Sequence, residues 1–332
     1  LATAAAVIAS QAIISGAFSL TMQAIQLGYS PRLRAIYTSE RVIGQIYVPV
    51  VNWGLMLACV ALVLGFRTSS NLAAAYGVAI TTTMLITTVL FYVVARRRWH
   101  WPAAAALPIA AFFIAIDLAF FGANMLKIAH GGWFPLLVSA AILFLMLTWR
   151  KGRRVLRSRL GEICIPLNDF ISELKTQNIR RVPGTAVYMS GNRFGTPLAL
   201  LHNLKHNKVL HEQVVLLTVR TEEVPYLANP RDRVAVENLH EGFWRAQIHF
   251  GFMEKPNVPV ALDRVKQAGL RFDPMRTTYF IGRETILATR KRGLSSWRGS
   301  FFAWMTRNAG DVTSYFCLPP NGVVELGARV EV

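Results

Sequence analysis

The residue most able to do chemistry in this sequence is an acid set inside an apolar run. Asp117 is the one charged residue of the run Pro102–Leu126. A carboxyl group is costly to place in lipid, so an intramembrane acid predicts either a cation ligand or a proton carrier. A structural alternative is a neutral carboxyl held by one hydrogen bond. Because the run contains no Lys or Arg, we expect any partner of Asp117 on another helix or upstream of the chain.

Hydroxyl oxygens form a second candidate site. Tyr76, Thr83 and Thr87 recur at i, i+7 and i+11, which places them within about 20° of one line along a helix. Neutral oxygens suit a weakly hydrated monovalent cation, which must bind and then leave again. The alternative is a Thr-rich packing face, and the spacing alone favours neither interpretation.

A polar stripe in the first uncharged run is a third candidate. Its members fall within an arc of about 120° on one helix, and they are Gln11, Ser15, Ser19, Gln23 and Gln26. We expect the stripe to face the interior of a helix bundle, because polar groups in a membrane need partners. Gln11 and Ser15 are the members we assign to an ion pathway, with hydrogen bonding between helices as the alternative.

Motifs for enzymatic chemistry are weak in this chain. The run His211–Val215 begins like a zinc-protease motif but ends in Val, so the second zinc ligand is missing. His202 and His206 are four residues apart, which is a weak metal signal without further ligands. The sequence shows no pairing of nucleophile and base. We therefore expect no enzyme and no cofactor.

Long uncharged runs must position these side chains. Hydrophobic residues make up 53% of the 332 residues and charged residues only 16%. The 21 residues Ile46–Phe66 would form a helix about 31 Å long, enough for a hydrocarbon core of ~30 Å. We predict a membrane domain over residues 1–149 with five transmembrane helices, at about 1–27, 46–66, 72–95, 102–126 and 132–149. The chain opens on Leu1 inside an apolar run, and we expect it to be the C-terminal part of a longer protein.

Loop charges predict the orientation. The loops 28–45, 96–101 and 150–159 carry three, three and six Lys or Arg, whereas 67–71 and 127–131 carry one each. The positive-inside rule then places the first set, and the chain after residue 150, in the cytoplasm. We read residues 150–160 as a basic juxtamembrane linker that binds lipid headgroups, and we expect no nucleic acid as a partner. Residues 161–332 alternate between strand and helix signals and predict a small α/β cytoplasmic domain.

The strand signals of this domain are β-branched apolar runs at Thr185–Met189 and Val214–Arg220, and the helix signals lie at Leu198–Leu210 and Val258–Ala268. In a reducing cytoplasm we expect Cys164 and Cys317 to be free thiols.

Several strings resemble the bacterial KUP (HAK/KT) potassium uptake family across essentially the whole chain. Those in the first half are Ser10–Ser19 with Gln23–Gly28, Thr38–Glu40, Gly44–Pro49, Val51–Trp53 and Ser69–Gly77. Those in the second half are Arg181–Ser190, Leu201–Glu212 and Pro319–Gly327.

The resemblance implies an α-helical polytopic membrane protein with an amino-acid–polyamine–cation-type inverted-repeat fold and a cytoplasmic C-terminal domain. It implies potassium uptake across the cell inner membrane as a proton symport, with K+ and H+ as cargo. The acids credited with ion coupling in the family lie on N-terminal helices outside this sequence, and the resemblance places Asp117 on a peripheral helix. It therefore implies the N-terminal helices of the same protein as partners, besides membrane lipid.

Two further partners follow from the resemblance alone. They are a second copy in a homodimer and a cyclic dinucleotide that regulates the tail, although no residue pattern here establishes the latter. Two other functions stay open. One is an amino-acid or polyamine permease of the same fold, and the other is a membrane-anchored sensor with a ligand-binding cytoplasmic domain.

Overall fold

The computed structural model describes most of the chain. The described residues are 1–37, 46–163, 165–177, 179–191, 195–222, 224–227, 233–239, 241–263, 270, 272–287 and 295–331. Two of the family-like strings reach into the gaps between these ranges: Thr38–Glu40 lies outside the described residues, and so do the first two residues of Gly44–Pro49. Cys164, expected to be a free thiol, and residues 264–268 of a helix expected over Val258–Ala268 lie outside them.

Five helices are long and apolar enough to cross a membrane. They are α1 (Ala2–Gln26), α2 (Pro49–Phe66), α3 (Ser69–Arg97), α4 (Ala103–Met125) and α5 (Trp133–Ile163). Their outer surfaces are mostly apolar and exposed, as expected of helices that face lipid or other helices. The prediction of five apolar helices ahead of a sheet-containing domain is confirmed.

Two of the helix ends differ from the predicted bounds. Residues Ile46–Tyr47 (β2) pair with Ile36–Tyr37 (β1) in a short antiparallel ladder, so α2 begins only at Pro49. Helix α5 does not stop at Trp149 but continues to Ile163 through the stretch read as a linker. Lys and Arg are good helix formers, so a change from apolar to basic residues ends the lipid-facing surface without ending the helix.

The tail is built on a six-stranded sheet with strand order β5-β6-β4-β3-β7-β8. The strands are β3 (Arg180–Met189), β4 (Val209–Glu222), β5 (Val234–Asn238), β6 (Phe243–Gly251), β7 (Thr277–Leu287) and β8 (Val323–Glu331). All neighbours pair in parallel except β5, which pairs antiparallel with β6 at one edge. Strand β3 lies at the point where the order reverses, since β4 and β6 follow on one side and β7 and β8 on the other.

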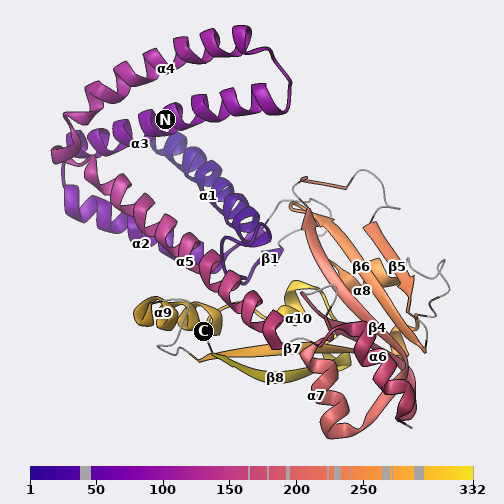
Figure 1. Cartoon of the computed structure of the whole chain (residues 1–332). Helices are drawn as coiled ribbons and strands as arrows, with labels where there is room; N and C mark the ends of the chain where they lie inside the picture. Colours follow the sequence, from indigo (N-terminus) through magenta and orange to yellow (C-terminus); the bar gives the residue numbers. More distant parts are fainter. Residues whose placement is uncertain are drawn as a thin grey trace. The chain divides into compact units, whose positions relative to one another are not determined.

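Helices cover both faces of this sheet. They are α6 (Leu167–Thr176), α7 (Leu198–Asn207), α8 (Val258–Asp263), α9 (Ser296–Arg307) and α10 (Val312–Tyr315). Alternate residues of a strand point to opposite faces. Ala186 and Tyr188 of β3 therefore pack with α6 and α7, and Val187 packs with α8 and the segment around α10. The tail is thus an α/β domain with two hydrophobic cores, and Figure 1 shows its sheet with the surrounding helices.

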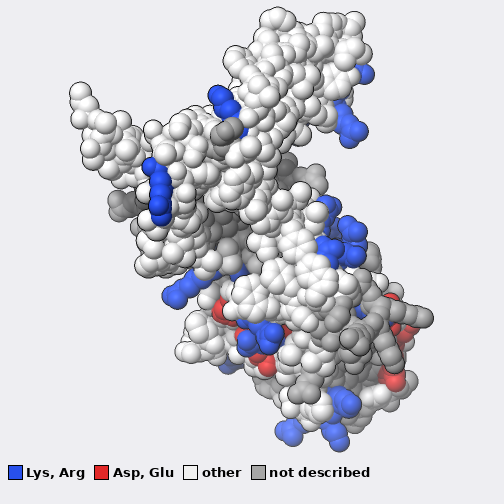
Figure 2. Space-filling model, turned by 90° about the vertical axis from the view of Figure 1, so that its left-hand side faces the viewer, with Lys and Arg blue, Asp and Glu red and all other residues white. Residues whose placement is uncertain are grey.

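The helix expected over Leu198–Leu210 is three residues shorter in the structure. Lys208 adopts a left-handed conformation with φ of 55°, which ends α7 and turns the chain directly into β4 at Val209. The chain divides into two compact units, one of residues 1–50 with 146–332 and one of residues 51–145. In Figure 2 the surface of the apolar helices is mostly uncharged, with a few separate Lys or Arg side chains, whereas the acidic side chains seen in this view lie over the sheet domain.

Candidate functional site

The polar stripe of α1 changes its surroundings along the helix. Gln11 and Ser15 are exposed, whereas Ser19, Gln23 and Gln26 are half-buried. The Nε2 atom of Gln26 donates a hydrogen bond to the backbone carbonyl of Glu254, at 3.1 Å. The structure therefore gives the last member a hydrogen-bond partner, and it leaves the oxygens of Gln11 and Ser15 open on the helix surface.

The three oxygens predicted on α3 lie on one exposed line of that helix. Tyr76 is 68% exposed, and Thr83 and Thr87 are exposed as well. Each Thr hydroxyl donates to the carbonyl four residues earlier, Thr83 to Ala79 at 2.9 Å and Thr87 to Thr83 at 2.8 Å. This bonding uses the hydroxyl hydrogen and orients the oxygen lone pairs away from the helix. The line can therefore accept hydrogen bonds or coordinate a cation.

The opposite face of α3 packs against α4. Its buried residues Ala74, Val78 and Thr81 lie about 140° to 200° around the helix from the Tyr76 line. A Cβ atom added at Gly77 would lie 2.5 Å from the Asn124 Oδ1 of α4, so the two helices approach closely there. Helix α3 thus has two different faces. One is a seam of small and buried residues that packs against α4, and the other is an exposed line that carries the oxygens of Tyr76, Thr83 and Thr87.

Asp117 lies in this seam. It is only 4% exposed, and its Oδ2 accepts a hydrogen bond from the Thr88 hydroxyl of α3 at 2.6 Å. The expected partner on another helix is therefore Thr88. Sequence reasoning missed Thr88 because it does not belong to the Tyr76 line, and only the antiparallel pairing of α3 with α4 brings it opposite Asp117.

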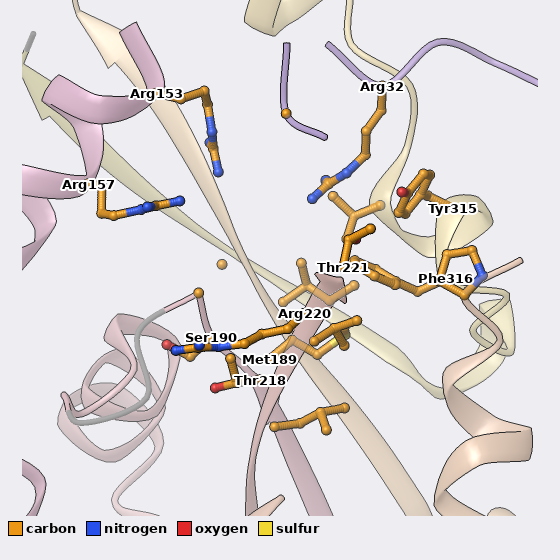
Figure 3. Close-up of a pocket in the computed structure, with 18 of the residues that line it drawn as sticks. Arg32, Arg153, Arg157, Met189, Ser190, Thr218, Arg220, Thr221, Tyr315 and Phe316 are labelled. Atoms are coloured by element: carbon orange, nitrogen blue, oxygen red, sulfur yellow. The ribbon is translucent and has the colours of Figure 1, made fainter. Parts of the chain in front are cut away.

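A second candidate site is a cleft of about 1460 Å³ at the carboxyl ends of the parallel strands. Its lining includes the end of α1 with the loop after it, the basic half of α5 and the ends of β3, β4 and β6. Open parallel sheets bind ligands at this edge, next to the point where the strand order reverses. In Figure 3, Arg32, Arg153 and Arg157 point into the space beside Ser190 and Arg220.

Arg32 is the most enclosed of these cations. Its guanidinium carbon lies 5.2 Å from the ring centroid of Tyr315 and 5.4 Å from that of Phe316. Its backbone carbonyl accepts a hydrogen bond from the Gly310 N–H. Burial lowers the pKa of the Arg32 guanidinium from its ordinary value, and the neighbouring positive charge of Arg153 lowers it further. An Arg side chain nevertheless keeps its charge at neutral pH.

Acidic side chains at the cleft already have cationic or imidazole neighbours. Glu254 accepts two hydrogen bonds from Arg233, at 3.1 and 2.8 Å, and one from the Gly251 N–H at 2.8 Å. Burial alone would raise the pKa of the Glu254 carboxyl, but these hydrogen bonds and the Arg233 charge lower it. Glu222 lies 2.6 Å from the His249 Nδ1. The arginines around the cleft can therefore hold an anionic group between guanidinium and hydroxyl donors.

Of the histidines that the sequence analysis examined, His202 is among the residues that line this cleft. The rings of His202 and His206 lie 6.0 Å apart, and His211 packs against Phe280. Within the described ranges, no three His, Cys, Asp or Glu side chains lie close enough together to hold a metal ion.

Comparison with known proteins assigns both parts of the chain. Residues 1–154 match the model of the "K+ potassium transporter integral membrane domain", and residues 183–332 match that of the "K+ potassium transporter C-terminal domain".

Relatives cover the whole chain. It is 54% identical over 332 residues to a "Probable potassium transport system protein Kup" of Myxococcus xanthus, covering 51% of that protein. It is 53% identical to a protein named "Probable potassium transport system protein Kup 1" of Paramagnetospirillum magneticum, and 51% identical to one of the same name in Geobacter sulfurreducens. These matches cover all of this chain and 52% and 53% of the two relatives. The chain thus spans about half the length of the curated relatives it matches.

The relatives are transporters and not enzymes, and they give no support to the permease or the sensor alternative. The two matched models together cover most of the chain, in the order in which the apolar helices and the α/β domain occur. The chain therefore belongs to the K+ potassium transporter (Kup) family.

Proposed function

We propose that the whole protein takes up potassium across the cytoplasmic membrane, as a K+:H+ symporter with an amino-acid–polyamine–cation-type inverted-repeat fold. For this chain, the proposal rests on the exposed hydroxyl oxygens of Tyr76, Thr83 and Thr87. They lie along one line of α3, opposite the face that packs against α4. Family membership supports the cargo, because the curated relatives are named for potassium transport.

The ion pathway uses neutral oxygens. A potassium ion sheds its hydration shell more readily when several oxygens replace the lost waters, and neutral ligands bind weakly enough to release it. Thr83 and Thr87 present such oxygens because their hydroxyl hydrogens are already bonded within α3. Tyr76, Gln11 and Ser15 complete the set that we assign to the pathway.

We assign Asp117 a positioning role. Its carboxyl group is buried between α3 and α4 and bonded to Thr88, on the packed side of α3 and away from the Tyr76 line. An acid in this position fixes the helix pair, and proton coupling belongs to acids elsewhere in the whole protein.

The orientation that we propose follows from the loop charges. The basic residues 150–159 continue from the last apolar helix into the α/β domain, so the positive-inside rule places that domain in the cytoplasm. A homodimer and a cyclic-dinucleotide regulator stay predictions. The arginine-lined cleft would suit the phosphates of such a regulator.

The test is uptake by a chimera that joins the first half of the Myxococcus xanthus relative to this chain. We expect the chimera to restore potassium-limited growth to an uptake-deficient bacterium, and a protonophore to abolish its rubidium uptake. Replacing Thr83 and Thr87 together by Val should raise the half-saturation concentration for rubidium several-fold.

Thr82→Val is the matched control. Thr82 makes the same kind of bond to a carbonyl four residues earlier, at 2.7 Å, but lies off the Tyr76 line. Its replacement should leave half-saturation unchanged. Equal effects of the two changes would mean that the hydroxyls serve helix packing only. A chimera that reaches the membrane without restoring growth would count against potassium uptake itself.

A further inference from the structure

Helix α9 carries an exposed aromatic ridge that the transport function does not use. Trp297 is 62% exposed and Trp304 is 53% exposed. The Phe301 ring stacks on that of Trp304, with centroids 5.6 Å apart and planes 15° apart. At ~100° per residue, the three side chains fall within about 60° of one another on the helix. Large aromatic side chains are costly to leave in water, so this ridge is a candidate interaction surface.

The opposite face of α9 is fixed to α5. The Phe302 ring lies 5.4 Å from that of Trp149, and a Cβ atom added at Gly152 would overlap it. The Arg298 Nη2 atom donates a hydrogen bond to the Thr148 hydroxyl at 3.1 Å. These contacts hold α9 beside residues 148–156 of α5, where both segments belong to the same compact unit. Figure 1 shows α9 next to this half of α5.

This attachment sets the depth of α9 in the membrane. Residues Gly132–Trp149 of α5 contain no charge, and six basic residues follow from Arg150 to Arg159. The boundary between lipid tails and headgroups on α5 therefore lies near Trp149. Thr148 and Gly152, which α9 contacts, are only about 6 Å apart along the axis at ~1.5 Å per residue. Helix α9 is thus held at the membrane surface, within the layer where Trp side chains favour the headgroups.

The amino-acid sequence of α9 and of the segments before and after it is basic, which suits an anionic surface. Between Glu284 and Asp311 the sequence has five basic residues and no acid, and these are Arg290, Lys291, Arg292, Arg298 and Arg307. Each cation near an anionic leaflet contributes about 1 kcal/mol of attraction. Aromatic rings on one side and cations nearby are the pattern of helices that lie in the headgroup region.

We propose that α9 is an interfacial anchor, which inserts Trp297, Phe301 and Trp304 among the headgroups of an anionic lipid surface. Because α9 lies in the connection between β7 and β8, the anchor attaches this connection to the membrane beside α5. It thereby holds the sheet domain at a fixed distance from the last membrane helix. The occupant of this ridge is lipid, and a second protein is the competing outcome of the test.

The test places a nitroxide spin label at the ridge. The full chain, with Cys59, Cys164 and Cys317 replaced by Ala, carries Trp304→Cys and is reconstituted in vesicles of phosphatidylcholine with a minority of phosphatidylglycerol. Collision rates with oxygen, which partitions into lipid, and with a water-soluble nickel chelate report the surroundings of the label. Met275→Cys is the matched control, because that apolar side chain is 92% exposed and lies in the short 3-10 turn Pro274–Arg276 that precedes β7. Trp297→Cys gives a second position on the ridge if Trp304→Cys does not fold.

We expect the ratio of oxygen to nickel collisions to be several-fold higher at the ridge than at position 275. A water-like ratio at both ridge positions would overturn the proposal. A label shielded from both reagents would also overturn it, because that result means a protein covers the ridge. A lipid-like ratio at position 275 as well would show that the membrane contact is not specific to α9.

Discussion

At the scale of single residues, His211 is placed where its charged form is disfavoured. Its ring packs edge-on against Phe280 with centroids 5.9 Å apart, and its backbone carbonyl accepts a hydrogen bond from Arg181 at 2.8 Å. Burial lowers the pKa of His211 below its ordinary value. The unfolded chain therefore binds this proton more readily than the folded domain does. It follows that neutral His211 makes its full contribution to the free energy of unfolding above about pH 6.5. This contribution declines as the pH falls below that value.

Replacing this histidine should make the tail less sensitive to mild acid. In the His211→Gln chain, the fall in melting temperature from about pH 7 to about pH 5 should be smaller than in the parent chain, because one protonation linked to unfolding is gone. Thermal unfolding of the detergent-solubilised chain, followed by near-ultraviolet circular dichroism, measures this difference. His206→Gln is the control, since His206 is exposed in the same domain. The same acid dependence in His211→Gln as in the parent would contradict the assignment.

At the scale of elements, the pair α3 and α4 is a closely packed hairpin of small residues. Ala95 and Ala106 are fully buried near the loop that connects the two helices, and Gly77 faces Asn124 at the open end of the hairpin. Small side chains let two helix backbones approach closely, which supports association in a membrane where apolar burial drives little. The hydrogen bond from Thr88 to Asp117 lies between these two ends.

Two glycines of this hairpin should respond oppositely to the same change. A Cβ at Gly77 would lie 2.5 Å from Asn124 Oδ1, whereas a Cβ at Gly122 would meet nothing within 4 Å. Gly122→Ala should therefore stabilise α4 by up to ~1 kcal/mol through helix propensity. Gly77→Ala should cancel that gain, because Asn124 must move. Thermal unfolding in detergent, read by proteolysis of the hairpin, compares the two.

A double change separates the steric effect from propensity. In Gly77→Ala with Asn124→Ala the clash is gone, so the added methyl group should stabilise the hairpin relative to Asn124→Ala alone. If Gly77→Ala is as stabilising as Gly122→Ala in the parent chain, the close approach of the two helices at this point is refuted.

The presence of the helices and strands can be predicted from the sequence, but the residues at which they begin and end cannot. Uncharged runs are enough to locate five helices, and β-branched apolar runs locate β3 and β4. The end of α7 depends on the left-handed Lys208, a conformation that no pattern in the sequence signals. The late start of α2, at Pro49, depends on the pairing of β2 with Ile36–Tyr37. The partner of Asp117 is likewise a consequence of pairing, because Thr88 is 29 residues away along the chain.

At the scale of the whole molecule, the compact units do not follow the division into apolar helices and tail. Helix α1 and the loop after it belong with the sheet domain, while residues 51–145 form the other unit. Two contacts make this connection. Gln26 donates a hydrogen bond to the Glu254 carbonyl, and the Arg32 guanidinium lies over the rings of Tyr315 and Phe316. Because α1 also carries Gln11 and Ser15, the tail is joined directly to a helix that we assign to the proposed pathway.

Arg32 should control how firmly α10 and the loop after α1 hold together. A partly desolvated cation over an aromatic ring contributes about 1–2 kcal/mol, so Arg32→Ala should raise local opening, and with it amide exchange, by about five- to thirtyfold. Hydrogen exchange read by mass spectrometry on the full chain in detergent should show this increase in residues 310–318, which include Gly310, donor to the Arg32 carbonyl. Arg34→Ala is the matched control, because Arg34 is an exposed cation two residues away. Equal exchange in the two variants would mean that the Arg32 side chain contributes nothing to the connection between the loop after α1 and α10.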